Sequence, residues 1–157
     1  MINLRIRQHG FRLLGLLAMS MFILPTAQAD LMMMARAPQG FPEAMSKLQE
    51  QILDKGYVVS RVQRVDIGLT KSGYKTDKYR VVFFGKPDEI RQLTARYPDL
   101  QAFLPLKISI FAEGADTILV AANPRHLSRA GDQQLAKVIA RWEQDIGAIF
   151  TKMRQEE

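Results

Sequence analysis

The chain has 157 residues and a formal net charge of +6, and it contains two histidines and no cysteine. The missing cysteine excludes disulfide bonds, thiol nucleophiles and thiolate metal sites. The length suits one domain with room for a hydrophobic core. The charge alone does not indicate nucleic-acid binding, because phosphate contacts require basic residues gathered on one face. We therefore expect one domain held together by packing, with no nucleic-acid partner, cofactor or metal.

Residues 1–29 have the layout of a cleaved secretory signal peptide. Three arginines precede an apolar run at 13–24, and small residues up to Ala29 supply a cleavage site. An uncleaved membrane anchor is the alternative, but a membrane-spanning helix needs about 20 apolar residues. Cleavage leaves 30–157 as a single domain with 19 basic and 16 acidic residues, a net charge of +3. We expect a periplasmic or secreted protein whose mature chain has no transmembrane segment.

The first half of the remaining chain predicts a strand, a helix and two further strands. Alternation at 31–36 indicates the first strand. Apolar residues at spacings of three and four predict a helix over 41–55, with a proline in its first turn. Residues 57–66 and 78–84 are typical of strands, and a bulge would absorb the phase slip in the former. The polar, lysine-rich stretch 67–77 between them predicts a long hairpin loop or an irregular strand end.

The second half predicts a short helix, a hairpin and a long helix. Pro87 begins the short helix and Pro98 ends it. Alternating residues at 106–110 and 118–122 indicate a hairpin closed by a glycine-containing turn. The strongest periodic pattern predicts an amphipathic helix over about 131–153, whose apolar stripe covers the sheet. The predicted fold is therefore α+β, in the order β-α-β-β-α-β-β-α, with a mostly antiparallel sheet and helices packed on one face.

Two motifs carry a resemblance to a known family. They are the corner FGKP at 84–87 and the stretch LPLKISI at 104–110, which precedes the glycine-containing hairpin. With the helix over 41–55 and Gly56, they resemble the domain-of-unknown-function 302 family over about 34–124. The resemblance implies a small α+β domain that is often paired as a homodimer. It implies no reaction and transfers no catalytic residue, and turn chemistry explains the same glycines and prolines without any function.

Four aromatic residues suggest a ligand pocket. For one of them, Trp142, a place in the core is the simpler interpretation. Trp142, the chain's single tryptophan, falls within the apolar stripe of the last helix. A small apolar ligand at the seam between that helix and the sheet would contact Trp142 together with Tyr57, Phe83 and Phe111.

The densest basic cluster lies in and just after the polar connection at 67–77, and it consists of Lys71, Lys75, Lys78 and Arg80. With two interleaved tyrosines, it has the chemistry to bind phosphate groups, anionic lipid heads or an acidic glycan. The simpler interpretation is a solvated hairpin, because lysines commonly protect exposed sheet edges.

Met32, Met33 and Met34 raise a copper hypothesis, since thioethers are ligands for Cu(I). Core packing is the simpler interpretation, because methionine commonly fills gaps in cores and no His or Cys lies nearby. His126, the single histidine beyond the leader, is expected to be a solvated loop residue. One histidine and no G-x-S-x-G motif leave a hydrolase triad unsupported.

The sequence thus favours a small exported binding or interaction domain, noncatalytic and homodimeric, that recognises an envelope component or a small ligand. An enzyme with an unrecognised Lys, Tyr or carboxylate site is one alternative. A copper-binding or stress-related periplasmic protein is the other.

Overall fold

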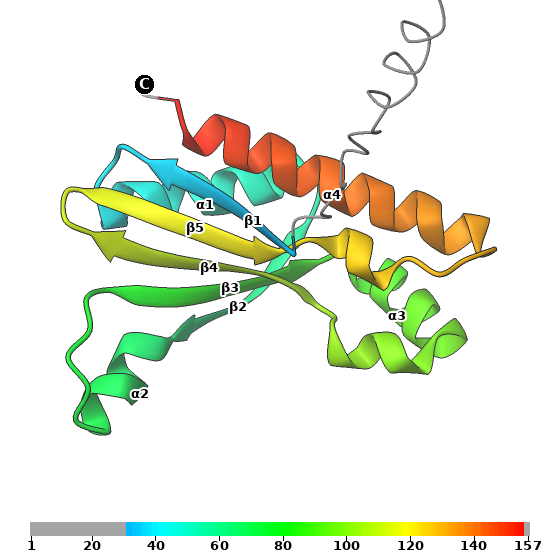
Figure 1. Cartoon of the computed structure of the whole chain (residues 1–157), viewed down its shortest axis with the longest axis horizontal. Helices are drawn as coiled ribbons and strands as arrows, with labels where there is room; N and C mark the ends of the chain where they lie inside the picture. The colour runs from blue at the N-terminus through cyan, green and yellow to red at the C-terminus, as the bar shows by residue number, and fades with distance from the viewer. Residues whose placement is uncertain (1–30, 156–157) are drawn as a thin grey trace, which may run out of the picture.

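The computed structural model describes residues 31–155, so the predicted signal peptide and its expected cleavage near Ala29 lie outside the described residues (Figure 1). Five strands form one antiparallel sheet in the order β1-β5-β4-β3-β2. The strands are β1 (Met32–Ala37), β2 (Val58–Arg64), β3 (Tyr79–Gly85), β4 (Leu106–Glu113) and β5 (Asp116–Ala122). The predicted α+β fold with a mostly antiparallel sheet is confirmed.

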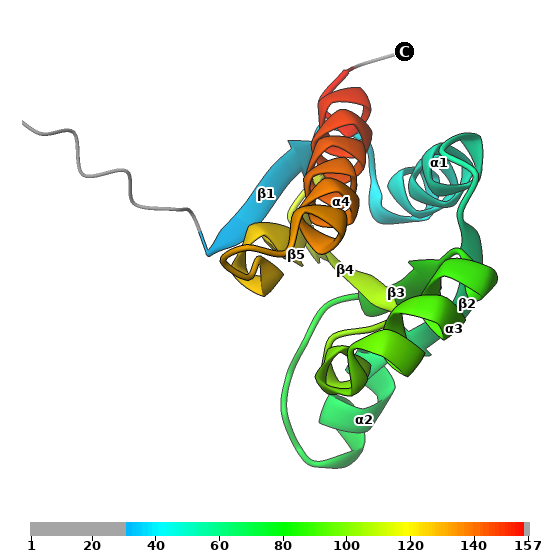
Figure 2. The same cartoon turned by 90° about the vertical axis from the view of Figure 1, so that its right-hand side faces the viewer.

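Two long helices cover one face of this sheet. They are α1 (Phe41–Asp54) and α4 (Gln133–Met153), which lie along the same side of the sheet in both views (Figures 1 and 2). The shorter elements are α2 (Val65–Lys71), α3 (Pro87–Arg96) and the 3-10 turns η1 (Pro98–Ala102) and η2 (Pro124–Leu127). Among residues 31–155, no helix has the length and apolar character needed to cross a membrane.

The core lies between the sheet and this helix layer. In β4, Leu106, Ile108 and Ile110 are buried and alternate with exposed or half-buried residues, as one-sided burial of a strand requires. The helices contribute residues spaced by three and four, including Leu48 and Ile52 of α1. Trp142 is buried in the middle of α4, which confirms its expected place in the core.

The FGKP corner has a packing reason for its glycine. Gly85 ends β3 and is buried, and α3 begins two residues later at Pro87. A methyl group on Gly85 would overlap the side chain of Ile90. The glycine therefore permits α3 to fold back closely onto the end of β3.

The connection between β2 and β3 differs from the sequence prediction. Residues 65–71 form the helix α2, where a strand end and a polar loop were expected. None of the α2 residues is buried, so the helix leaves no apolar period in the sequence. Its local support is electrostatic, because Asp66 lies in the first turn and Lys71 in the last. The predicted element order therefore lacks one helix.

The predicted bulge in β2 is present, but earlier than the phase slip suggested. The register moves from Val59 opposite Phe84 to Arg61 opposite Phe83, which leaves Ser60 as the extra residue. Val58 and Val62 consequently lie on opposite faces of the sheet. The apolar residues at 65 and 67 belong to α2 and do not continue the strand.

Candidate functional site

The face of the sheet turned away from α1 and α4 is the candidate functional site, and we call it the open face (Figure 2). Side chains alternate between the two faces of a strand, so the residues between the buried positions point to this side. The members are Met32, Met34 and Arg36 of β1, Val58, Arg61 and Gln63 of β2, Tyr79, Val81 and Phe83 of β3, Lys107, Ser109 and Phe111 of β4, and Ile118 and Val120 of β5.

The centre of the open face is largely apolar. The register aligns Val81, Ser109, Val120 and Met34 in one row across four strands. A neighbouring row contains Tyr79, Phe111 and Ile118, in which the two aromatic rings meet edge-on with centroids 5.9 Å apart. Antiparallel sheets that face water on one side normally carry polar residues there. A contiguous apolar patch instead marks a surface for interaction.

Met34 shows how open this patch is, with 58% of its surface exposed. Met32 and Val58 are also exposed, whereas Ile118 is buried between its neighbours. Core packing, expected for all three N-terminal methionines, therefore holds only for Met33, which packs against the core. Met32 and Met34 point to the open face because they occupy alternate positions of β1.

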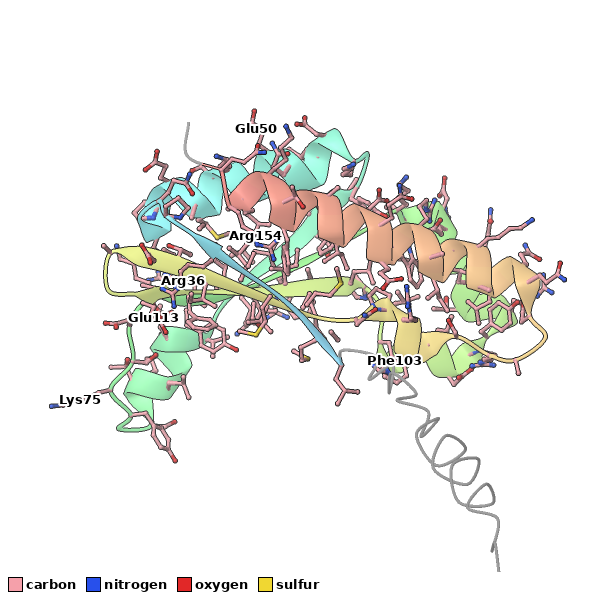
Figure 3. All side chains as sticks on the ribbon, turned by 45° about the horizontal axis from the view of Figure 1, so that its top comes forward. Arg36, Glu50, Lys75, Phe103, Glu113 and Arg154 are labelled. Carbon is pink, nitrogen blue, oxygen red and sulfur yellow. The ribbon has the colours of Figure 1, made fainter. Side chains whose placement is uncertain are left out.

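Charged groups lie at the rim of the open face. Arg36 forms ion pairs with Glu113 and Asp116 at the end of the β4–β5 hairpin (Figure 3). Arg154, beyond the end of α4, donates a hydrogen bond to the backbone oxygen of Met34 at 2.6 Å. Exposed ion pairs of this kind contribute little to stability, about 0–1 kcal/mol each. An apolar centre with a polar rim is the usual anatomy of a protein interface.

A second group of polar side chains lies at the helix layer. The hydroxyl of Tyr57 donates a hydrogen bond of 2.6 Å to Oδ2 of Asp145 in α4. Nζ of Lys55 lies 4.0 Å from the other carboxylate oxygen, and Nζ of Lys86 lies 4.9 Å from the Tyr57 ring centroid. These contacts connect the start of β2 to the middle of the C-terminal helix.

The chemistry of Tyr57 follows from its burial. Burial first, and then the hydrogen bond to Asp145, raises the pKa of Tyr57 above the ordinary value of about 10. The phenol therefore stays protonated at neutral pH and acts as a hydrogen-bond donor. A nucleophile or base requires the opposite shift, so this arrangement serves to position α4 against the sheet.

Glu89 joins α3 to α4 in the same layer. It accepts a hydrogen bond of 3.0 Å from Nε1 of Trp142 and forms an ion pair with Arg141. Glu89 also lies in the first turn of α3, where negative charge is favourable at a helix N-terminus. A buried indole N–H usually finds such a partner. Trp142 is thus a core residue whose hydrogen bond to Glu89 also holds α3 against α4.

The four aromatic residues predicted to line one ligand pocket lie on two faces. Tyr57 and Trp142 are buried at the helix layer. Phe83 lies between the buried residues Val82 and Phe84, so it points to the open face, as does Phe111 beside Tyr79. The structure therefore does not bring all four together. Strand periodicity fixes which residues share a face, but it does not reveal which face the helices cover.

The predicted basic cluster is divided by acidic side chains. Lys71 and Lys78 line a shallow hollow of about 450 Å³ together with Asp66 and Asp77. Arg80 forms an ion pair with Asp66, and this hydrogen-bonded contact holds the pKa of Asp66 below its usual value. Lys75 projects away from the sheet at the far end of the molecule (Figure 3).

Metal ligands are not gathered in the described part of the chain. Within residues 31–155, no group of three or more His, Cys, Asp or Glu side chains is placed to hold a metal ion. His126 lies in η2 and is exposed, in agreement with the sequence interpretation of a solvated residue.

These observations define a small α+β domain whose single antiparallel sheet is covered on one face. The chain belongs to the DUF302 family, a domain of unknown function, whose family model matches residues 34–153. The match includes α4, which lies beyond the 34–124 covered by the sequence resemblance.

Solved structures include a similar fold. The crystal structure of the uncharacterized conserved protein DUF302 from Bacillus stearothermophilus has a TM-score of 0.71 and 20% sequence identity to this chain. The likeness covers 80% of this chain and 100% of that chain. At this identity it shows the fold alone. None of the curated protein sequences matches this chain.

The Tyr57–Asp145 contact predicts a measurable stability effect. We expect Tyr57→Phe to lower the free energy of unfolding by about 2 kcal/mol, because a hydrogen bond to a charged group is lost. Tyr74→Phe, at a residue that is 65% exposed, is the matched control and should change it by less than about 0.5 kcal/mol. Urea denaturation monitored by circular dichroism measures both.

The same pair of variants gives a pH dependence with a definite sign. Because the pKa of Tyr57 is raised in the folded protein, its contribution to the free energy of unfolding is complete below the unfolded-state pKa of about 10. That contribution is lost as the pH rises further. The difference in free energy of unfolding between wild type and Tyr57→Phe should be constant from about pH 7 to 9 and should decrease above about pH 10. A difference that stays constant to about pH 11 contradicts this assignment.

Proposed function

We propose that this chain is a noncatalytic binding domain of the cell envelope that associates with a second copy of itself through the open face. One observation carries the proposal, namely the row of Val81, Ser109, Val120 and Met34, which places three apolar side chains in the centre of an uncovered sheet face. Water contact with such a patch is unfavourable by about 25 cal/mol per Å² of apolar surface. Association with a partner removes that contact.

A second copy is the simplest occupant of this face. In a twofold dimer the same patch meets itself, so an apolar centre is self-complementary by construction. The charged residues Arg36, Glu113 and Asp116 lie at the rim, where they stay hydrated and where Arg36 pairs with both carboxylates. The centre of the contact therefore contains no charge that would have to be desolvated. The family resemblance, which implies frequent pairing, agrees with this arrangement.

The size of the face limits the strength of the contact. Five strands about 4.8 Å apart, each about seven residues long at about 3.4 Å per residue, present roughly 500 Å² in projection. Stable specific interfaces bury about 800 Å² on each partner. We therefore expect a dimer that dissociates on dilution and not an obligate one.

The alternatives have weaker support in the geometry. Catalysis by a Lys, Tyr or carboxylate site would have its best candidates in Tyr57 and Asp145, but the raised pKa of Tyr57 is unfavourable for a nucleophile or base. For copper binding, Met32 and Met34 share the open face and would supply two thioethers. In the proposed dimer they contribute apolar contact area instead.

Residues 1–29 support the envelope location. The run of basic, apolar and small residues is the arrangement that directs a chain to export and is then removed. A cysteine-free domain needs no oxidative folding after crossing the membrane.

Removal of the leader is directly measurable. We expect the protein recovered from the cell envelope to begin at Asp30, because small residues up to Ala29 form the cleavage site. Intact-mass spectrometry reads the N-terminus, and Ala29→Arg should leave the leader attached because the cleavage site requires a small residue there. Full-length chain that starts at Met1 and remains in the cytoplasm contradicts the proposed location.

Association through the open face predicts a charge-sensitive dimer. Met34→Glu should raise the dimer dissociation constant by at least about 100-fold, because a carboxylate would have to be desolvated in the contact. Leu53→Glu is the matched control, since Leu53 lies on α1 away from the open face and is 59% exposed against 58% for Met34. Its dissociation constant should equal that of the wild type.

Sedimentation velocity across a range of protein concentrations measures these constants, and circular dichroism verifies that both variants are folded. A wild type that stays monomeric at several hundred micromolar contradicts the proposal. So does a Met34→Glu variant that associates as the wild type does.

A further inference from the structure

An apolar pocket lies at the end of the sheet where β4 begins and β5 ends, between η2 and α4. It has a volume of about 110 Å³. Its apolar wall is formed by Phe103, Leu106, Ala122, Pro124, Leu127 and Ile146. None of the four aromatic residues predicted to line a ligand site contributes to it.

The inner wall of the pocket is fixed by the core. Leu106 and Ile146 are buried, and Ile146 lies one helical turn beyond Trp142 on the same side of α4. Apolar cavities of about 150 Å³ hold a molecule of the size of benzene. The pocket is therefore matched to a single ring or a short aliphatic chain, and it is too small for a nucleotide or a sugar chain.

Phe103 marks the mouth of the pocket. It is 51% exposed although it is a large apolar side chain, and it projects beside the point where the described chain begins (Figure 3). A ligand in the pocket would cover part of this ring. That contact accounts for an aromatic side chain that is otherwise left in water.

The rim of the pocket is positive. Lys107 and His126 both line the pocket and are exposed. Within residues 31–155, Lys107 forms no ion pair and the His126 ring forms no hydrogen bond. The nearby acidic residue Glu143 is already paired with Arg125, whose Nε lies 3.0 Å from its carboxylate.

Asn123, the polar residue between the apolar wall and the rim, already has its hydrogen-bond partners. Asn123 accepts a hydrogen bond of 2.9 Å from the backbone N–H of Arg125 and donates one of 3.5 Å to Glu143. Its role is to shape the turn at η2, where it caps the first residues. The groups left to recognise a ligand are therefore one ammonium group and one imidazole.

We propose that this pocket binds a small monocarboxylate with one aromatic ring or a short aliphatic chain. The apolar body occupies the space beside Leu106 and Ile146, and the carboxylate lies at the rim near Lys107 and His126. A charge-assisted hydrogen bond from an ammonium group to a carboxylate is stronger than one between neutral groups. One permanent cation at the rim suits one negative charge. This inference goes beyond association through the open face and does not depend on it.

The chain's own leader is the competing occupant. The backbone N–H of Asn123 donates a hydrogen bond of 2.9 Å to the oxygen of Leu31, so the described chain starts beside the pocket. The test must therefore compare the protein with and without residues 1–29.

Methyl NMR of the purified protein that begins at Asp30 tests the proposal, with phenylacetate and hexanoate as probes. We expect saturable shifts of the Ile146 and Leu127 methyl signals at probe concentrations below about 10 mM. No saturable shift in that range, or shifts confined to methyl groups far from the pocket, overturns the proposal. Ile146 shifts caused by residues 1–29 alone, without any probe, assign the pocket to the leader and also overturn it.

Lys107→Gln tests the role of the charge. It should weaken phenylacetate binding about tenfold and leave the neutral analogue phenylacetamide unchanged, because only the carboxylate uses the ammonium group. Lys137→Gln, at an exposed lysine of α4 away from the pocket, is the matched control and should bind both probes as the wild type does. Equal affinity of wild type and Lys107→Gln for phenylacetate overturns the proposed recognition.

Sedimentation of Lys107→Gln separates this proposal from the one above, because Lys107 also lies at the end of the open face. Loss of phenylacetate binding with unchanged association supports the pocket and leaves the dimer untouched. Wild-type protein that dimerises but binds neither probe overturns the pocket alone.

Discussion

The sheet has two apolar faces, and the helix layer covers one of them. α1 and α4 bury Leu106, Ile108 and Ile110 of the central strand, together with their neighbours on β3 and β5. The opposite face carries Val81, Phe111 and Val120 at positions where a water-facing sheet would have polar residues. This uncovered apolar surface is the basis of the proposed association. It also contains large apolar side chains that the core does not use.

The polar residues at the helix layer have a different task. Tyr57 contacts Asp145, and Glu89 contacts Trp142, so each hydrogen bond joins two elements distant in the sequence. The groups that would be the first candidates for catalysis are thus engaged in positioning α3 and α4 against the sheet. The proposed functional surfaces are the open face and the pocket at the end of β4, where apolar residues form the centre and charged residues lie at the edge.

Sequence periodicity predicted the helices and strands that bury one face. It failed for an element with no buried residues, because such an element has no apolar period. The helices at 41–54 and 133–153 carry apolar stripes, and both were found. α2 buries nothing, so its polar sequence was interpreted as a loop. In β5 the apolar residues Ile118 and Val120 point to the open face, while Leu119 and Ala121 face the helices. Because every residue from 118 to 122 is apolar, alternation could not assign the covered face, and Phe83 and Phe111 were grouped with Tyr57 and Trp142 for the same reason.

Contacts across the dimer test the central claim most directly. In a sample that mixes isotope-labelled and unlabelled chains, filtered nuclear Overhauser effects report only contacts between two copies. If the open face is the interface, the Val81 and Val120 methyl groups of one copy give such effects with open-face side chains of the other. Effects that arise instead from the α1 surface around Leu53, under conditions where the protein is dimeric, would contradict the account.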